Sequence, residues 1–198
     1  MLFPPMNFAA VEEDLYRSAI PTEINIPFLQ QLNLRTVILL EHSEGSEDID
    51  PMVSFFLEDN NIEIVRIGEE DSASQTQGQG KSWQPISEEV VLRAMRELVN
   101  SAKYPLMVVD IYGKHRTGVL LACIRKVQRW SLASIFEEYR RYASGKRRLQ
   151  NEQFIELFDV DLVHIPENAP GFLHPLSQQQ QQQHLLQPGV AEKSAFRR

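Results

Sequence analysis

The sequence predicts an α/β fold in which a central, mostly parallel sheet is flanked by helices. Three short runs rich in β-branched residues alternate with segments of helical periodicity, and more helical segments follow the last run. Near-continuous apolar strands suit a sheet that is covered on both faces, and alternation of strands with helices favours this layered arrangement. The chain has 198 residues, 42% of them hydrophobic, which is enough to bury one sizeable core. We therefore expect one domain.

Strands are expected at RTVILLE (35–41), IEIVRIG (62–68) and PLMVVD (105–110). Helices are expected at residues 26–33, 51–61, 87–102, 117–130, 131–144 and 149–159. The third helix opens with Ser87 and two acidic residues, which suit a helix N-terminus. Its apolar residues recur at helical spacing and predict one buried stripe. Because three helices in series follow the final strand, we expect them to pack beside the sheet.

Domain boundaries are predicted from changes in composition. Residues 13–165 are expected to form the domain, after an N-terminal extension at residues 1–12. Residues 166–198 contain the glutamine run from Gln178 to Gln183 and show no apolar period, which predicts a disordered tail. The polar segment between Gly68 and Pro85 is too long for a simple connection. It is either a functional loop or an insertion without a role.

Charge and cysteine content exclude several classes of function. The formal net charge of -7 disfavours nucleic acid or an anionic membrane as the main partner, because such binding relies on Lys and Arg. The single cysteine, Cys123, fits a reducing compartment. The N-terminal segment has no Lys or Arg before Arg17, unlike a secretory signal, and no apolar run reaches the roughly 20 residues of a membrane span. We expect a cytoplasmic protein without cofactor or metal.

The segment VVDIYGKHRTG (108–118) has the features of an anion-binding loop. It joins a predicted strand to a predicted helix, whose first N–H groups point toward the loop. Gly113 permits a tight backbone turn, and Arg116 offers a planar fork for phosphate oxygens. The predicted anion-binding residues are Asp110, Ile111, Tyr112, Gly113, Lys114, His115, Arg116 and Thr117. The alternative is a basic turn without a ligand.

A second basic cluster comprises Lys146, Arg147 and Arg148. These residues are either an accessory anion site or a solvated patch at a helix end. Residues 123–129 match the C-x5-R pattern of cysteine-dependent phosphatases, but they contain no glycine and continue a helical apolar pattern. A hydrogen-bonded helix cannot form a cradle of converging N–H groups. We therefore expect Cys123 to be an inert thiol in the core.

Four segments resemble, in order and spacing, the plant and fungal atypical dual-specificity phosphatases. They are EDLYRSAIP (13–21), GKHRTG (113–118), CIRKVQRWSLASIFEEYRRYA (123–143) and NEQFIELFD (151–159). This family belongs to the cysteine-dependent tyrosine phosphatase superfamily, and its fungal branch includes the oxidant-induced cell-cycle arrest proteins and an inositol pyrophosphate phosphatase. The resemblance implies the dual-specificity phosphatase sandwich. It also implies a role in stress or cell-cycle signalling and hetero-oligomers with related phosphatase-like proteins.

The loop departs from the family where the chemistry occurs. Active members of the family read H-C-x-x-G-K-H-R-T-G, so Asp110 stands at the cysteine position and Val109 at the preceding histidine. By the same resemblance, Arg116 matches the arginine that holds phosphate oxygens, and Thr117 matches the following hydroxyl. Enzymes that use an aspartate nucleophile carry a D-x-D-x-[TV] motif and magnesium, which DIYGK does not match. We expect no catalytic residue, and we expect the Asp110 carboxylate to occupy the loop within reach of Arg116.

Three functions follow as hypotheses. The first is a pseudophosphatase that acts as a regulatory or scaffold subunit with related phosphatase-like proteins. The second is a module that binds phosphate or inositol polyphosphates through the basic residues of the loop. The third is a weak phosphatase for inositol pyrophosphates or proteins, with Glu70 or Asp71 as the general acid.

Overall fold

The computed structural model describes residues 2–43, 48–69, 86–143, 145 and 148–174. Five strands form one sheet in the order β1-β2-β5-β3-β4. Their bounds are β1 (Ala9–Glu12), β2 (Leu15–Ala19), β3 (Thr36–Ser43), β4 (Glu63–Glu69) and β5 (Leu106–Asp110). The β1-β2 pair is antiparallel, whereas the other neighbours are parallel. The predicted α/β fold with a mostly parallel sheet is confirmed.

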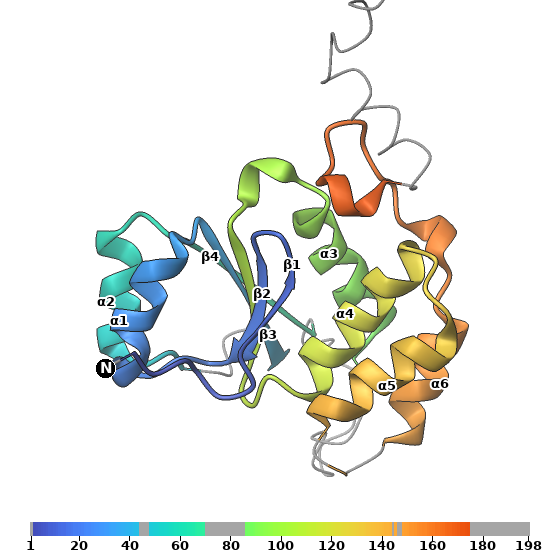
Figure 1. Ribbon diagram of the computed structural model, residues 1–198, viewed down its shortest axis with the longest axis horizontal. Helices are drawn as coiled ribbons and strands as arrows, with labels where there is room; N and C mark the ends of the chain where they lie inside the picture. Colours follow the sequence, from blue (N-terminus) through green and yellow to red (C-terminus); the bar gives the residue numbers. More distant parts are fainter. Residues whose placement is uncertain (1, 44–47, 70–85, 144, 146–147, 175–198) are drawn as a thin grey trace, which may run out of the picture.

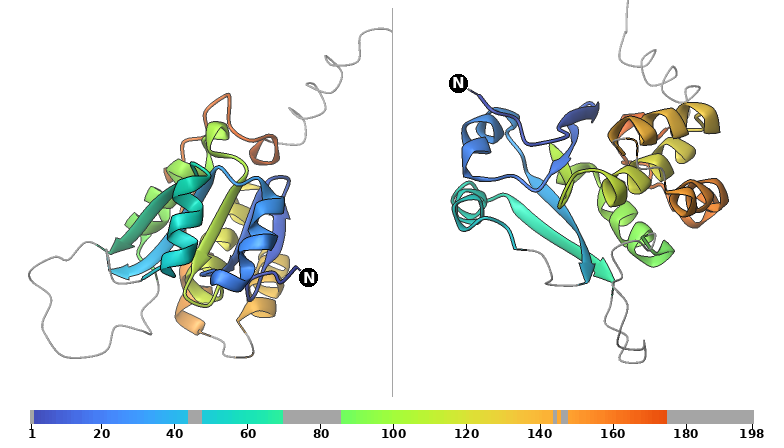
Figure 2. Two further views of the ribbon diagram at one scale, coloured as in Figure 1. Left: turned by 90° about the vertical axis from the view of Figure 1, so that its left-hand side faces the viewer. Right: turned by 90° about the horizontal axis from the view of Figure 1, so that it is seen from below.

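The helices cover both faces of this sheet. Their bounds are α1 (Ile26–Leu29), α2 (Pro51–Asp59), α3 (Glu88–Leu98), α4 (His115–Val127), α5 (Leu132–Tyr142) and α6 (Leu149–Leu157). Figure 1 shows α1 and α2 on one face and α3 to α6 on the other, and the two turned views of Figure 2 show the same two layers around the sheet. Five of these helices lie within segments predicted to be helical, whereas α4 overlaps its predicted segment and begins two residues before it.

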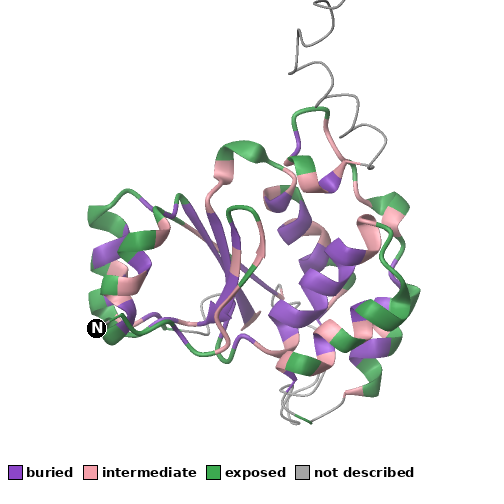
Figure 3. Ribbon diagram, in the orientation of Figure 1, coloured by how far each residue is buried: buried purple, intermediate pink, exposed green. Residues whose placement is uncertain are grey.

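Side-chain alternation along β5 determines toward which face of the sheet the last side chain of the strand points. Met107 and Val109 pack in the core beneath α1 and α2, whereas Leu106 and Val108 pack in the larger core under α3 to α6. All four are buried, as are most residues of the sheet in Figure 3. Because successive side chains on a strand point to opposite faces, Asp110 extends toward the α4 side. The strand register thus places its carboxylate beside the start of α4.

Strands β1 and β2 were not expected from the sequence. Strand β2 contains the polar residues Arg17 and Ser18, which are both buried. Because of these polar residues, the segment does not have the apolar pattern of a buried strand. Strand β1 lies in the predicted N-terminal extension but is part of the sheet. At the other end, Ala169 and Leu173 are buried in the larger core, beyond the predicted boundary at residue 165. Strands and helical turns of only three to five residues are too short to show an apolar period in the sequence.

Several predictions concern residues outside the described part of the chain. These are Glu70 and Asp71 in the long polar loop, Lys146 and Arg147 in the second basic cluster, and the glutamine run of the predicted tail. Within the described residues, no helix combines the length and the apolar character required to cross a membrane.

Candidate functional site

The loop between β5 and α4 lies at the carboxyl edge of the sheet and presses against the end of β2. Gly113 has a φ of 63°, and a Cβ atom there would lie 2.4 Å from the carbonyl carbon of Ser18 and the nitrogen of Ala19. The backbone of Ile20 also donates to the Asp110 carbonyl at 2.9 Å. Only glycine fits a backbone position that has both a positive φ and this close approach. The predicted role of Gly113 as the tight turn thus has a direct steric cause.

The carboxylate of Asp110 lies at the centre of the loop, where it is 6% exposed. Its Oδ1 accepts from the backbone N–H groups of Tyr112 at 2.8 Å, Gly113 at 2.6 Å and Lys114 at 3.3 Å. Its Oδ2 accepts from the N–H of Thr117 at 2.9 Å. These donors belong to the loop and to the first turn of α4, where helical N–H groups have no partner within the helix. Asp110 therefore satisfies donors that would otherwise be available to an external anion.

Arg116 has a different carboxylate partner from the one expected. Its Nη2 lies 3.3 Å from Oε1 of Glu69, at the end of β4, and its side chain is 8% exposed. Glu69 also accepts from the backbone N–H of Ser87 at 3.1 Å and from its hydroxyl at 2.6 Å. Among the described residues, the carboxylate of Asp110 accepts only from backbone N–H groups. The contact of Arg116 with Glu69 was not expected, because the sequence could not show that β4 ends beside α4.

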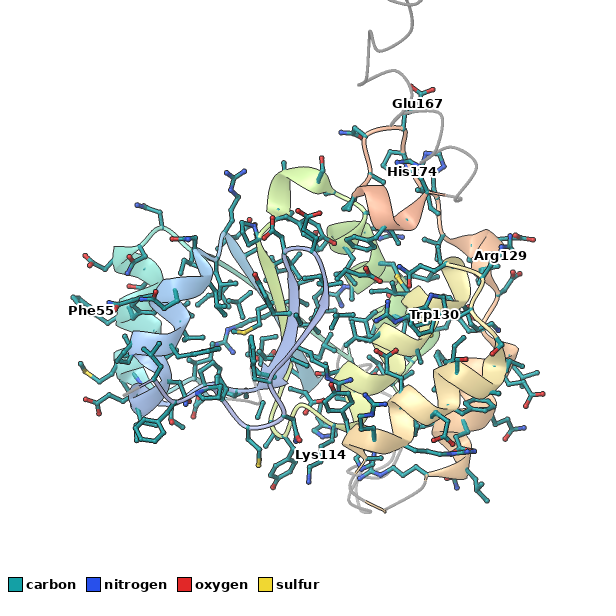
Figure 4. All side chains as sticks on the ribbon, viewed as in Figure 1. Phe55, Lys114, Arg129, Trp130, Glu167 and His174 are labelled. Carbon is teal, nitrogen blue, oxygen red and sulfur yellow. The ribbon has the colours of Figure 1, made fainter. Side chains whose placement is uncertain are left out.

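A pocket of about 70 Å³ opens above the loop. Six loop residues line it, together with His42, Ile86, Arg148 and Asn151. Arg148 was expected as an accessory basic residue, whereas the other three were missed because they come from segments distant in sequence and match no motif. Figure 4 shows Lys114 at this edge of the molecule, with Arg129 at the opposite end of α4. The pocket thus brings three cationic side chains, Lys114, Arg116 and Arg148, around one buried carboxylate.

Two histidines, His42 and His115, line the pocket wall. Nδ1 of His115 lies 3.1 Å from the hydroxyl of Tyr139, and that hydroxyl accepts from Nδ2 of Asn151 at 2.8 Å. The tautomer of His115 decides whether Nδ1 accepts from the Tyr139 hydroxyl or donates to it. Burial, followed by the positive charge of Arg116, lowers the pKa of His42. A neutral His42 is therefore favoured in the folded protein.

Two further polar groups lie away from the pocket surface. The Thr117 Oγ1 is buried and has no hydrogen-bond partner among the described residues. Cys123 is fully buried within α4, and burial raises the pKa of its thiol. A thiol in that environment is protonated and inaccessible, so it cannot act as a nucleophile. The expectation that Cys123 lies in the core is confirmed.

Comparisons with known proteins agree with the described fold. The chain matches the Tyrosine phosphatase family over residues 2–174, and it belongs to that family. It is 46% identical to the OCA1 protein of Mycosarcoma maydis over 164 residues, which are 82% of this chain and 97% of that protein. It is 36% identical to the inositol diphosphatase DSP4 of Arabidopsis thaliana over 167 residues, 84% of this chain and 79% of that protein.

A solved structure extends this comparison to three dimensions. The core catalytic domain of the PP-IP phosphatase SIW14 from S. cerevisiae, solved with citrate, superimposes with a TM-score of 0.68 and 34% identity, covering 81% of this chain and 90% of that one. The fold is thus that of the tyrosine and dual-specificity phosphatases, and inositol diphosphatases are among the relatives.

Proposed function

We propose that this protein is a catalytically inactive member of its family and acts in the cytoplasm as a regulatory or scaffold subunit. Its partners would be related phosphatase-like chains, in stress or cell-cycle signalling. The observation that carries the proposal is the Asp110 carboxylate, which accepts from four backbone N–H groups of the phosphate loop. A negative charge of the protein itself thus occupies the position that an active enzyme would leave for phosphate.

The chemistry of the loop supports inactivity. Cysteine-dependent phosphatases need a thiolate that can reach phosphorus, and the single cysteine of this chain is buried in α4. Asp110 would have to leave its backbone donors before it could attack. It would also approach a phosphate dianion as a like charge, which is unfavourable at short range. Neither residue therefore provides an efficient nucleophile.

The loop surface supports a role in binding proteins. Ile111 is 39% exposed and Tyr112 58% exposed at the tip of the loop. The side-chain amide of Asn7 donates to the Tyr112 carbonyl at 2.7 Å, which ties the N-terminal segment to that tip. Exposed apolar side chains on a loop held in place by hydrogen bonds provide contact area without a large cost in ordering. We assign the contact with a partner chain to this loop tip.

Phosphate release tests the proposed inactivity. Purified protein is expected to hydrolyse p-nitrophenyl phosphate and inositol pyrophosphates no faster than the Arg116→Ala variant, which lacks the phosphate-gripping side chain. Turnover that disappears in Asp110→Asn would overturn the proposal and identify aspartyl catalysis. Turnover that disappears in Cys123→Ser would show that the loop has been assigned to the wrong segment.

Affinity purification of the intact protein tests the proposed partners. Related phosphatase-like chains are expected to co-purify with the wild-type protein and to be depleted with Tyr112→Ser. The matched control is Phe55→Ser, which alters another exposed aromatic residue, on α2 rather than on the loop. If the wild-type protein, Tyr112→Ser and Phe55→Ser all recover the same related chains, the contact does not lie at the loop tip. Absence of such chains from every sample would overturn the subunit proposal.

A phosphoanion-binding module is the second candidate, supported by the three cations that line the pocket. Calorimetry with an inositol polyphosphate distinguishes it from the first. Binding by the wild-type protein that is weakened by both Lys114→Ala and Arg148→Ala would favour the second candidate. No heat of binding at millimolar ligand would favour the first.

A further inference from the structure

Arg17 on β2 is a buried cation beneath the phosphate loop. It is 1% exposed, and its only hydrogen bond among the described residues is from Nη2 to the carbonyl oxygen of Gly113, at 2.7 Å. The guanidinium lies 3.6 Å above the ring of Tyr142, near the end of α5. Burial lowers the pKa of Arg17 to about 10, and the group is still protonated at neutral pH. The protein thus holds a full positive charge in its interior, and no carboxylate of the described segments is hydrogen-bonded to it.

A buried charge without a direct counterion is costly, so its nearest opposite charges become important. The peptide group between Gly113 and Lys114 connects Arg17 to Asp110. The carbonyl oxygen of this peptide accepts from Arg17, and its N–H donates to Oδ1 of Asp110 at 3.3 Å. Hydrogen bonds in such a chain polarise one another. The cation and the carboxylate therefore interact through one peptide group of the loop.

We propose that Arg17 is the charge that determines the anion preference of the phosphate loop. It acts as a positioning residue, because it contacts the loop backbone rather than the anion. Its positive charge and its hydrogen bond orient the Gly113–Lys114 peptide so that the N–H points into the loop. In this protein the anion that benefits is the carboxylate of Asp110. This inference rests on the proposed role of Asp110 as an internal substitute for phosphate.

The geometry also explains why this residue is an arginine. The guanidinium is flat, which allows it to lie on the Tyr142 ring while one edge donates to the loop. A lysine would retain the charge, but it has no planar surface to stack on the ring. A glutamine could still donate to the Gly113 carbonyl, but it would remove the charge. These two substitutions separate the effect of charge from that of the hydrogen bond.

The test is a set of sulfate titrations. Binding is monitored by the change in melting temperature and by the amide resonances of the loop. Asp110→Asn is expected to bind sulfate about tenfold more tightly than the wild-type protein, because a competing charge is removed. In combination with Arg17→Gln, the gain from Asp110→Asn should fall below about threefold, whereas with Arg17→Lys most of the gain should remain. The control is Arg35→Gln, which removes an exposed arginine that also donates to a carbonyl, that of Ala102, away from the loop. It should leave the tenfold gain unchanged.

The inference would be overturned if Asp110→Asn increased sulfate affinity equally with the wild-type Arg17, with Arg17→Gln and with Arg17→Lys. A purely structural arginine would change stability without changing the preference for anions. If Arg17→Gln does not fold, the Nε–H resonance of Arg17 in Asp110→Asn provides the decisive measurement. It should shift during the sulfate titration with the same midpoint as the amide of Lys114. A resonance that does not move would overturn the inference. Because these are measurements of binding, turnover in the phosphate-release assay would contradict only the proposed inactivity.

Discussion

Replacement of Asp110 by asparagine tests whether the carboxylate holds the loop in its observed shape. An asparagine Oδ1 could still accept from the N–H groups of Tyr112, Gly113 and Lys114. Its Nδ2 would then face the N–H of Thr117, which now lies 2.9 Å from Oδ2 of Asp110. Two donors would meet, and the opposite orientation of the amide would be worse because it faces three donors. The substitution therefore leaves at least one buried N–H without an acceptor.

The magnitude follows from these contacts. An unsatisfied buried donor costs about 1–3 kcal/mol, and the remaining hydrogen bonds lose the part of their strength that came from the charge. We expect Asp110→Asn to lower the free energy of unfolding by about 2–3 kcal/mol in the absence of added anions. Sulfate at about 100 times its dissociation constant should restore about 2.7 kcal/mol, because it binds the folded state.

The measurement is urea denaturation at several sulfate concentrations, with Asp50→Asn as the matched control. Asp50 also accepts from backbone N–H groups, those of Met52 at 2.9 Å and Glu23 at 3.3 Å, but it caps the N-terminus of α2 outside the pocket. Because asparagine caps a helix about as well as aspartate, its substitution should cost less than about 1 kcal/mol and show no specific rescue by sulfate. Equal stabilisation of the wild-type protein and Asp110→Asn by sulfate would refute the assignment of Asp110 as an internal anion.

Two further predictions concern the loop and the pocket wall. Gly113→Ala should destabilise the protein by more than about 3 kcal/mol, since its Cβ would collide with the backbone at Ser18 as well as require a positive φ. Gly145→Ala is the control, because Gly145 has a φ of 74° but no atom within 4 Å of a Cβ, and it should cost only about 1 kcal/mol. The lowered pKa of His42 favours its neutral form in the folded state. Its contribution to the free energy of unfolding is therefore fully present above the pKa of the unfolded state and is lost as the pH falls from there through the lower pKa of the folded state. His42→Gln should therefore lose less stability between pH 7 and pH 5 than the wild-type protein in denaturation curves; an unchanged pH dependence would contradict this reasoning.

Local patterns in the sequence were sufficient to predict the layers of the fold. Strands β3, β4 and β5 contain short runs rich in β-branched residues, and the long helices carry apolar stripes, so the local pattern predicts the conformation of each. The tight turn at Gly113 was also readable, because Gly113 and the start of α4 are adjacent in the chain and need no distant partner. The same holds for Cys123, whose helical neighbours predicted its burial.

Tertiary contacts decided what the local pattern could not. The pairing of Arg116 with Glu69 depends on where β4 ends relative to α4, and the closure of the pocket by Asn151 depends on how α6 packs. The role of Arg17 is the clearest case, since an arginine in a short polar segment is expected to face solvent. Only the parallel pairing of β2 with β5, which places Arg17 beside Val108, brings its charge beneath the loop. The sequence by itself determined that a tight glycine turn joins a strand to a helix and begins with a carboxylate, because backbone geometry and residue type act locally. The charged side chains that surround that carboxylate, such as Arg17 and Arg148, were decided by the folded structure, because electrostatic contacts depend on distance in space.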